Sequence, residues 1–121
     1  MKKGEEKMEK AKKNVDGACM VTAVDARDTA LMGAWTTFST SATAALSTRK
    51  DALKAAWALT DTAQRNTAIK TAWAAYTKAV KTARNTFKTA KKSAWKTFKT
   101  AAKACKQPSA DASGESSDGQ L

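Results

Sequence analysis

The sequence predicts an all-α fold, a long antiparallel two-helix hairpin, and three observations carry this prediction. The chain is rich in Ala, Lys and Thr, with five Gly and one Pro among its 121 residues, a composition typical of helices. Its central part repeats every 11 residues, which is about three helical turns at 3.67 residues per turn. One turn signal divides the repeating part into two segments of similar length.

The two ends of the chain read differently from its centre. Residues 1–15 hold six Lys and three Glu and predict a charged mobile arm. They do not resemble a signal peptide, because Glu5, Glu6 and Lys7 stand where an apolar stretch would be needed. Residues 107–121 hold three acids and no base and predict a disordered acidic tail. The hairpin is therefore expected over residues 16–106.

The turn is expected in "LTDTAQ", Leu59 to Gln64. Thr60 or Asp61 can cap a following helix, and Gln64 stands three residues after Asp61, in the position of a capping box. The first helix is thus predicted over about 16–59, the turn at about 60–62 and the second helix over about 62–106.

The repeat itself follows one template: a small residue, a large one, two variable positions, an aromatic, two variable positions and a small residue. It is seen in segments that begin at Ala34, Ala72, Ala83 and Ala94. Since 11 residues complete whole helical turns, each template position stays on one helix face. The alternation of a strand is absent.

Small residues form one stripe on each predicted helix, at alternating steps of 4 and 7. The stripes are Cys19, Ala23, Ala30, Ala34, Ser41, Ala45, Ala52 and Ala56, then Ala68, Ala72, Ala79, Ala83, Ala90, Ala94, Ala101 and Cys105. Folding the chain back at the turn aligns them and sets Cys19 opposite Cys105. We therefore expect a Cys19–Cys105 disulfide, worth roughly 4 to 5 kcal/mol by the loop-entropy model. Two buried free thiols are the alternative.

Large side chains form a second stripe beside the small one. They predict an association face made of Trp35, Phe38, Leu46, Leu53, Trp57, Ile69, Trp73, Tyr76, Val80, Phe87, Trp95 and Phe98. A two-helix hairpin cannot cover such a face by itself. The expected cover is a second copy, in a four-helix bundle or longer homo-oligomer. Nucleic acid or another polyanion, and a membrane surface, are the alternatives.

Positive charge is concentrated in the second helix. The net charge of the chain is +11, and residues 62–106 hold twelve Lys or Arg and no acid. These residues either keep an Ala-rich helix soluble or bind a polyanion. The polyanion-binding candidates rim the association face: Lys70, Lys81, Lys88, Lys92, Lys99 and Lys103.

The composition argues against catalysis. The chain has no His, only two Cys, and no glycine-rich phosphate loop, so the usual groups for nucleophilic, acid–base or metal chemistry are missing. We expect a non-enzymatic structural or interaction module that needs no cofactor and no metal.

Four stretches carry a family resemblance: "RKDALKAAWALTD", "AIKTAW", "SAWKTFKTAAKAC" and the tail "DASGESSDGQL". Together with Cys19 and Cys105, they resemble a group of uncharacterised, Ala-rich, two-cysteine secreted helical proteins of candidate-phyla bacteria. The resemblance covers residues 16–121 and implies no activity. It implies export, and a disulfide likewise predicts an extracellular or cell-surface location. The first 15 residues, which lack a signal peptide, instead predict a cytoplasmic one.

Overall fold

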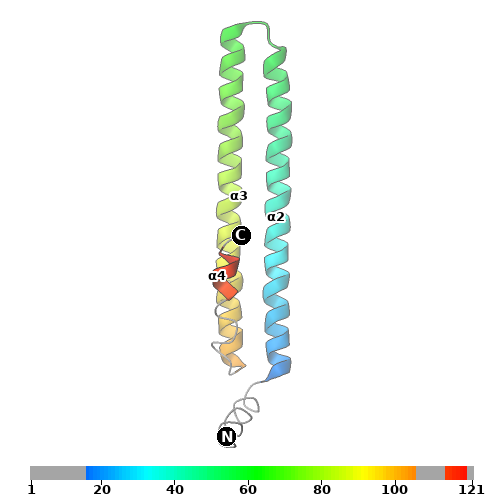
Figure 1. The fold of residues 1–121 in the computed structure, drawn as a ribbon, viewed down its shortest axis with the longest axis vertical. Coiled ribbons are helices and arrows are strands. Elements are labelled where there is room, and N and C mark those ends of the chain that lie inside the picture. Colours follow the sequence, from blue (N-terminus) through cyan, green and yellow to red (C-terminus); the bar gives the residue numbers. More distant parts are fainter. Residues whose placement is uncertain (1–15, 106–113, 120–121) are drawn as a thin grey trace, which may run out of the picture. The chain divides into compact units, whose positions relative to one another are not determined.

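The structure is a computed structural model that describes residues 16–105 and 114–119. Its elements are α2 (Gly17–Ala58), α3 (Thr62–Ala104) and the short α4 (Gly114–Asp118), and the described residues contain no strand. Helix α3 returns antiparallel beside α2 (Figure 1). The predicted all-α helical hairpin is confirmed.

Both long helices begin at an aspartate cap. The Asp16 carboxylate accepts a hydrogen bond from the backbone N–H of Cys19 at 3.0 Å, and Asp61 accepts one from Gln64 N–H at 2.7 Å. Each cap satisfies an N–H group that has no partner within the helix. Of the two caps that the sequence offers for the second helix, Thr60 and Asp61, the structure uses Asp61.

Arg65 closes the turn from the other side. Its guanidinium donates to the Leu59 carbonyl through Nε at 3.1 Å and through Nη2 at 2.7 Å. This carbonyl lies just beyond the end of α2, where backbone oxygens lose their helical partners. The first turn of α3 thus stabilises the last turn of α2.

The chain divides into two compact units. One contains Met1–Met32 and Ala90–Leu121, and is called here the disulfide unit; the other is Gly33–Thr89, the turn unit. Segments of α2 and α3 pack against each other in both.

In the disulfide unit the core is small. Ala23, Trp95, Phe98 and Ala102 are buried together, and a second group of apolar side chains packs against them: Met20, Val24, Leu31 and Ala101. In the turn unit the buried alanines recur every 11 positions on each helix, at Ala45 and Ala56 on α2 and at Ala72 and Ala83 on α3, and Phe87 is buried as well.

The predicted small-residue stripes are only partly buried. Alternate members of each stripe form two rows, each with an 11-residue spacing. One row lies in the contact between the helices, but Ala30, Ser41 and Ala79, in the other row, are exposed. The reason is that larger groups occupy the second row of the contact: Arg27, Phe38 and Arg49 from α2, and Tyr76, Phe87 and Phe98 from α3. In the turn unit the exposed row borders a groove of about 650 Å³, and half of the residues that line it are alanines.

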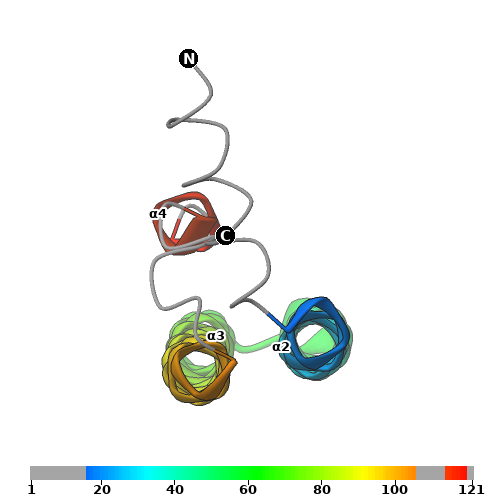
Figure 2. The same ribbon diagram turned by 90° about the horizontal axis from the view of Figure 1, so that it is seen from below.

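The tail also differs from the expectation of disorder. Where the sequence predicts a disordered segment over 107–121, Gly114–Asp118 form α4. In a view along the helices, α4 lies to one side of α2 and α3, next to α3 (Figure 2). The short helix is held by side chains of α3 rather than by helix propensity. The predicted mobile arm, residues 1–15, and residues 107–113 and 120–121 of the tail lie outside the described residues.

Candidate functional site

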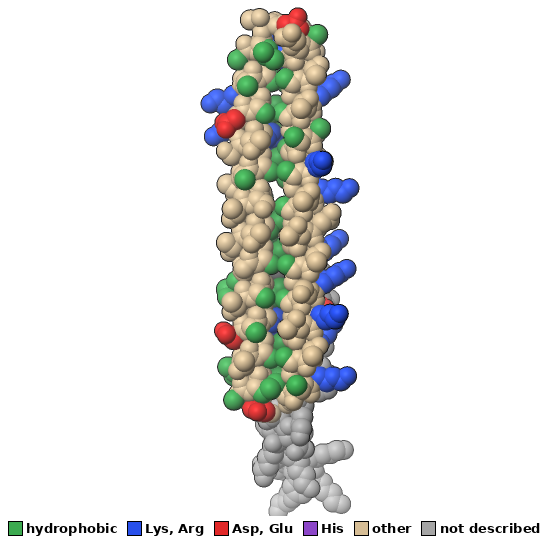
Figure 3. Space-filling view, turned by 180° about the vertical axis from the view of Figure 1, so that it is seen from behind, with side chains coloured by type: hydrophobic (Ala, Val, Ile, Leu, Met, Phe, Trp, Pro, Cys, Tyr) green, Lys and Arg blue, Asp and Glu red, His purple; other side chains and the backbone are tan. Residues whose placement is uncertain are grey.

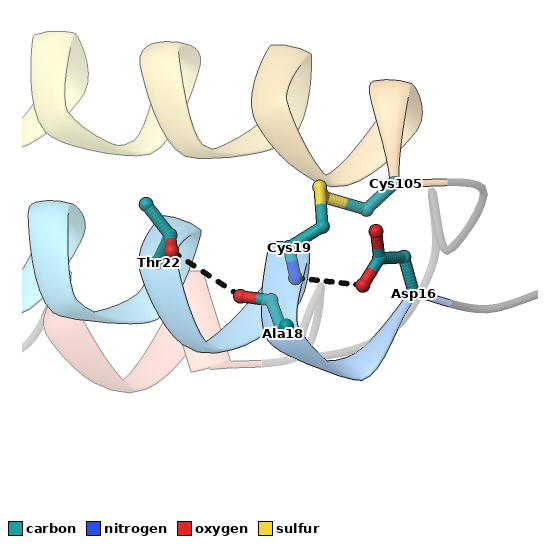
Figure 4. Close-up of a disulfide and its surroundings, with 5 residues drawn as sticks. All are labelled: Asp16, Ala18, Cys19, Thr22 and Cys105. Atoms are coloured by element: carbon teal, nitrogen blue, oxygen red, sulfur yellow. Dashed lines mark hydrogen bonds between the residues drawn. A yellow bond between two sulfur atoms is a disulfide. The ribbon is translucent and has the colours of Figure 1, made fainter.

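The two cysteines form a disulfide at the open end of the hairpin. Their Cα atoms are 5.6 Å apart, within the range that a disulfide requires, and they are separated by 86 residues in the sequence. The cap of α2 lies beside the bond (Figure 4). The backbone N–H of Asp16 also donates to the Cys105 carbonyl at 3.4 Å. The predicted Cys19–Cys105 bridge is confirmed.

Arginines from one helix lie over aromatic rings of the other. In the disulfide unit the Arg27 guanidinium carbon is 4.7 Å from the Trp95 ring centroid and 4.3 Å from that of Phe98. In the turn unit Arg49 repeats this arrangement over Trp73 and Tyr76, at 4.7 and 4.3 Å. These distances are within the range of cation–π attraction.

The aromatic pairs themselves are alike. The rings of Trp95 and Phe98 meet edge to face with centroids 5.5 Å apart, and those of Trp73 and Tyr76 with centroids 6.1 Å apart. The two pairs lie 22 residues apart on α3, as do the two arginines on α2, so each spacing is two repeats of 11.

Two further contacts within the turn unit use other groups. Trp35, Phe38 and Phe87 form an aromatic cluster with centroid distances of 5.4 to 5.8 Å. Near the turn, Arg65 of α3 lies 5.4 Å from the Trp57 ring of α2. The sequence interpretation missed the arginines. The signal was present, because Arg27, Phe38 and Arg49 are spaced by 11 and meet Phe98, Phe87 and Tyr76, which share the same spacing.

The residues of the predicted association face are not equally exposed to solvent. Phe87, Trp95 and Phe98 are buried inside the chain, whereas Trp35, Trp57 and Trp73 are 48%, 64% and 47% exposed and Leu46 is 43% exposed. The remaining members are half-buried: Phe38, Leu53, Ile69, Tyr76 and Val80. The exposed part of the face therefore belongs to the turn unit. We call Trp35, Leu46, Trp57 and Trp73 the tryptophan patch.

In the disulfide unit, α4 covers Trp95, which is only 3% exposed. The Trp95 indole Nε1–H donates to the Asp118 carboxylate at 2.6 Å, and Lys91 Nζ donates to the Asp118 carbonyl at 3.2 Å. Lys99 forms an ion pair with Glu115. Trp95 and its two flanking lysines thus have a protein segment bound on them.

The polyanion-binding candidates are all exposed. Lys70, Lys81, Lys92 and Lys103 recur every 11 residues and so share one face of α3, with Lys88 and Lys99 beside them. Figure 3 shows basic side chains projecting along the outer edge of α3. None of the residues of α3 is acidic. Helix α3 therefore carries a row of positive charges with no acidic side chain on the same helix. Lys99 pairs with an acid of another helix, Glu115 of α4.

Two kinds of site are not found among the described residues. They contain no group of three His, Cys, Asp or Glu side chains placed to hold a metal ion. None of the helices in the described part is long and apolar enough to cross a bilayer. The alanine-lined groove carries no buried polar side-chain atom without a hydrogen-bond partner, so nothing in it marks a ligand site.

Comparisons with known proteins found no match: no protein-family model, no curated protein and no solved structure is significantly similar to this chain. The resemblance to secreted two-cysteine helical proteins therefore stays a prediction from the sequence.

Proposed function

We propose that this chain is a non-enzymatic helical module that self-associates through the tryptophan patch of its turn unit. The observation that carries the proposal is the contrast between two equivalent positions on α3. Trp73 and Trp95 each form an edge-to-face pair and each lie under an arginine. Trp95 is covered by protein and Trp73 is 47% exposed.

The patch is large enough to matter. If each of its four side chains still exposes about 80 to 100 Å², two copies facing each other would bury roughly 700 Å² of apolar surface. At about 25 cal/mol per Å² this is an upper bound of about 17 kcal/mol. Association costs about 4 to 15 kcal/mol. The balance favours a dimer of weak to moderate affinity.

Charge supports a second copy as the occupant. In a two-fold arrangement with the symmetry axis parallel to the helices, α3 of each copy lies opposite α2 of the other. Residues 33–48 of α2 contain no charged side chain. Lysines of α3 that lie opposite this stretch would therefore meet no charged side chain, and the two basic helices would be on the diagonal of a four-helix arrangement.

The test is the oligomeric state of the full chain and of matched variants. Multi-angle light scattering and sedimentation should show a dimer or larger species. Trp73→Ser and Trp35→Ser should each weaken it by about tenfold or more. Met32→Ser is the control, because Met32 is 63% exposed but lies outside the patch. A chain that stays monomeric at its highest soluble concentration, or equal weakening by all three variants, would contradict the proposal.

Polyanion binding is the second candidate, and the acid-free, lysine-rich α3 favours it. The exposed lysines would neutralise the backbone phosphates of a bound nucleic acid, so the affinity would fall steeply as the salt concentration rises. For the natural setting we infer an oxidising compartment, extracellular or at the cell surface, because disulfides persist there.

A further inference from the structure

Within the disulfide unit, helix α4 is held against α3 by three residues of α3 at intervals of four. Lys91 and Trp95 both bind Asp118, through its carbonyl and its carboxylate, and Lys99 binds Glu115. Residues four apart lie on one face of a helix, so the three groups form a continuous strip. The strip offers two cations with an apolar ring and an N–H donor between them.

The bound segment has matching chemistry. Glu115 and Asp118 are three residues apart and lie on the same face of α4, which lets both carboxylates reach the strip. Gly114 approaches the edge of the Trp95 ring, where a Cβ would lie 3.2 Å from Cη2. A residue with a side chain there would have to push the ring aside. The strip therefore fits a small residue, an acid, two further residues and a second acid.

This strip occurs once along the repeats of α3 in the described residues. Two repeats earlier, Trp73 occupies the position of Trp95, but Ile69 and Thr77 replace the two lysines. No segment of the described chain covers Trp73, and it is half exposed. Binding of the acidic segment therefore depends on the two lysines as well as on the tryptophan.

We propose that Lys91, Trp95 and Lys99 form a binding site for short acidic helical peptides, which the chain's own Gly114–Asp118 fills in cis. The site recognises carboxylates spaced three residues apart behind a small residue. Because the resident segment is tethered, its effective concentration is high, and an added peptide competes well only when that segment is weakened. This surface is distinct from the tryptophan patch, and its function does not depend on self-association.

The experiment uses the indole N–H signals of the full-length chain in two-dimensional NMR, with the Trp95 signal assigned by Trp95→Phe. In the unaltered chain the Trp95 indole proton should exchange slowly with water, since it is buried and hydrogen bonded. Glu115→Gln with Asp118→Asn should shift the signal and speed its exchange at least about tenfold. Titrating this variant with a synthetic peptide, DASGESSDGQL, should restore the original signal in a saturable way.

Matched controls make the result specific. Asp25→Asn with Asp51→Asn removes two exposed carboxylates of α2, giving the same change in net charge, and should leave the Trp95 signal unchanged. A peptide with Gln and Asn in place of its Glu and second Asp should bind at least about tenfold more weakly, as should the original peptide after Lys91→Gln and Lys99→Gln. Circular dichroism confirms that each variant keeps its helices.

Three outcomes would overturn the proposal. The first is a Trp95 indole proton that exchanges freely in the unaltered chain. The second is equal binding of the charged and neutral peptides. The third is a single-stranded oligonucleotide that saturates the site as tightly as the acidic peptide, because the strip would then be a general polyanion site.

Discussion

Replacing Arg27 by Met tests whether the arginine–aromatic layers stabilise the hairpin. The side chain of Arg27 is only 10% exposed, and its guanidinium lies within 5 Å of two ring centroids, those of Trp95 and Phe98. Met keeps an unbranched apolar stem of similar length and removes the cation. The change therefore isolates the charge more cleanly than Ala would.

The expected loss follows from the geometry. Cation–π contacts are worth about 0.5 to 1 kcal/mol when exposed and about 2 kcal/mol when desolvated. Arg27→Met should thus cost about 2 kcal/mol. Arg49→Met should cost about 1 kcal/mol, because Trp73 beneath Arg49 is half exposed. Arg84→Met, at an exposed position of α3, should stay within about 0.5 kcal/mol of the unaltered chain.

Urea unfolding followed by circular dichroism measures these differences. At about 1 to 3 kcal/mol per molar urea, Arg27→Met should lower the midpoint by roughly 1 M. Asp28→Asn is needed beside it, because Arg27 also pairs with Asp28 at 2.9 Å. That pair is half exposed on the carboxylate side and should matter little. Equal midpoints for the Arg27 and Arg84 variants, or an Asp28→Asn loss as large as that of Arg27→Met, would refute the reasoning.

The remaining predictions concern the ends of the hairpin and its charge. Cys19→Ser with Cys105→Ser should keep the helix content but lower the free energy of unfolding by about 4 to 5 kcal/mol, since the bond closes a loop of 86 residues; a midpoint unchanged by the substitutions would contradict this. Asp61→Ala should cost about 1 kcal/mol in the same urea assay through loss of the α3 cap, and no loss would mean that water replaces the carboxylate. On heparin or single-stranded DNA, Lys92→Ala should flatten the dependence of log affinity on log salt by about 0.7 to 0.9. Trp73→Ala should lower affinity for single-stranded DNA only if bases stack on the patch, which separates designed nucleic-acid binding from loose electrostatic attraction.

The helical hairpin, its turn and its disulfide could be predicted from the sequence because each depends on local or strictly periodic signals. The aspartate at the turn, the 11-residue repeat and the two cysteines at equal distance from Thr62 are visible without any structure. With the turn fixed, antiparallel pairing allows one register of the two small-residue stripes. This register sets Cys19 opposite Cys105, which supports it.

The division of the aromatic residues into buried and exposed ones could not be predicted in the same way. Trp73 and Trp95 have the same repeat position, and each has an aromatic neighbour three residues on, Tyr76 and Phe98. What separates them is a contact with Gly114–Asp118, a segment whose composition predicts disorder. A segment of five residues is too short for its sequence to predict a helix. The only sequence signal for its binding position is the pair of lysines four residues on either side of Trp95.

The arginines were missed for a different reason. A charged residue between two helices reads as a surface group when helix faces are assigned by hydrophobicity. The stem of Arg27 packs like an apolar side chain and its flat head lies on rings, so the repeat places it where an aliphatic residue is expected. Searching for the 11-residue spacing without regard to residue type would have found it.

The disulfide also determines how the molecule responds to mechanical load. Because Cys19 is near the start of α2 and Cys105 directly follows α3, the covalent path between the chain termini runs through the sulfur–sulfur bond and bypasses the 86-residue stretch that contains the turn. A pull between the termini is carried by that bond, and the hairpin bears none of the tension. In single-molecule stretching the oxidised chain should extend by only its two end segments, and the full contour length of the helices should appear after reduction. A module of this kind can be tethered at both ends without being unfolded by its attachments.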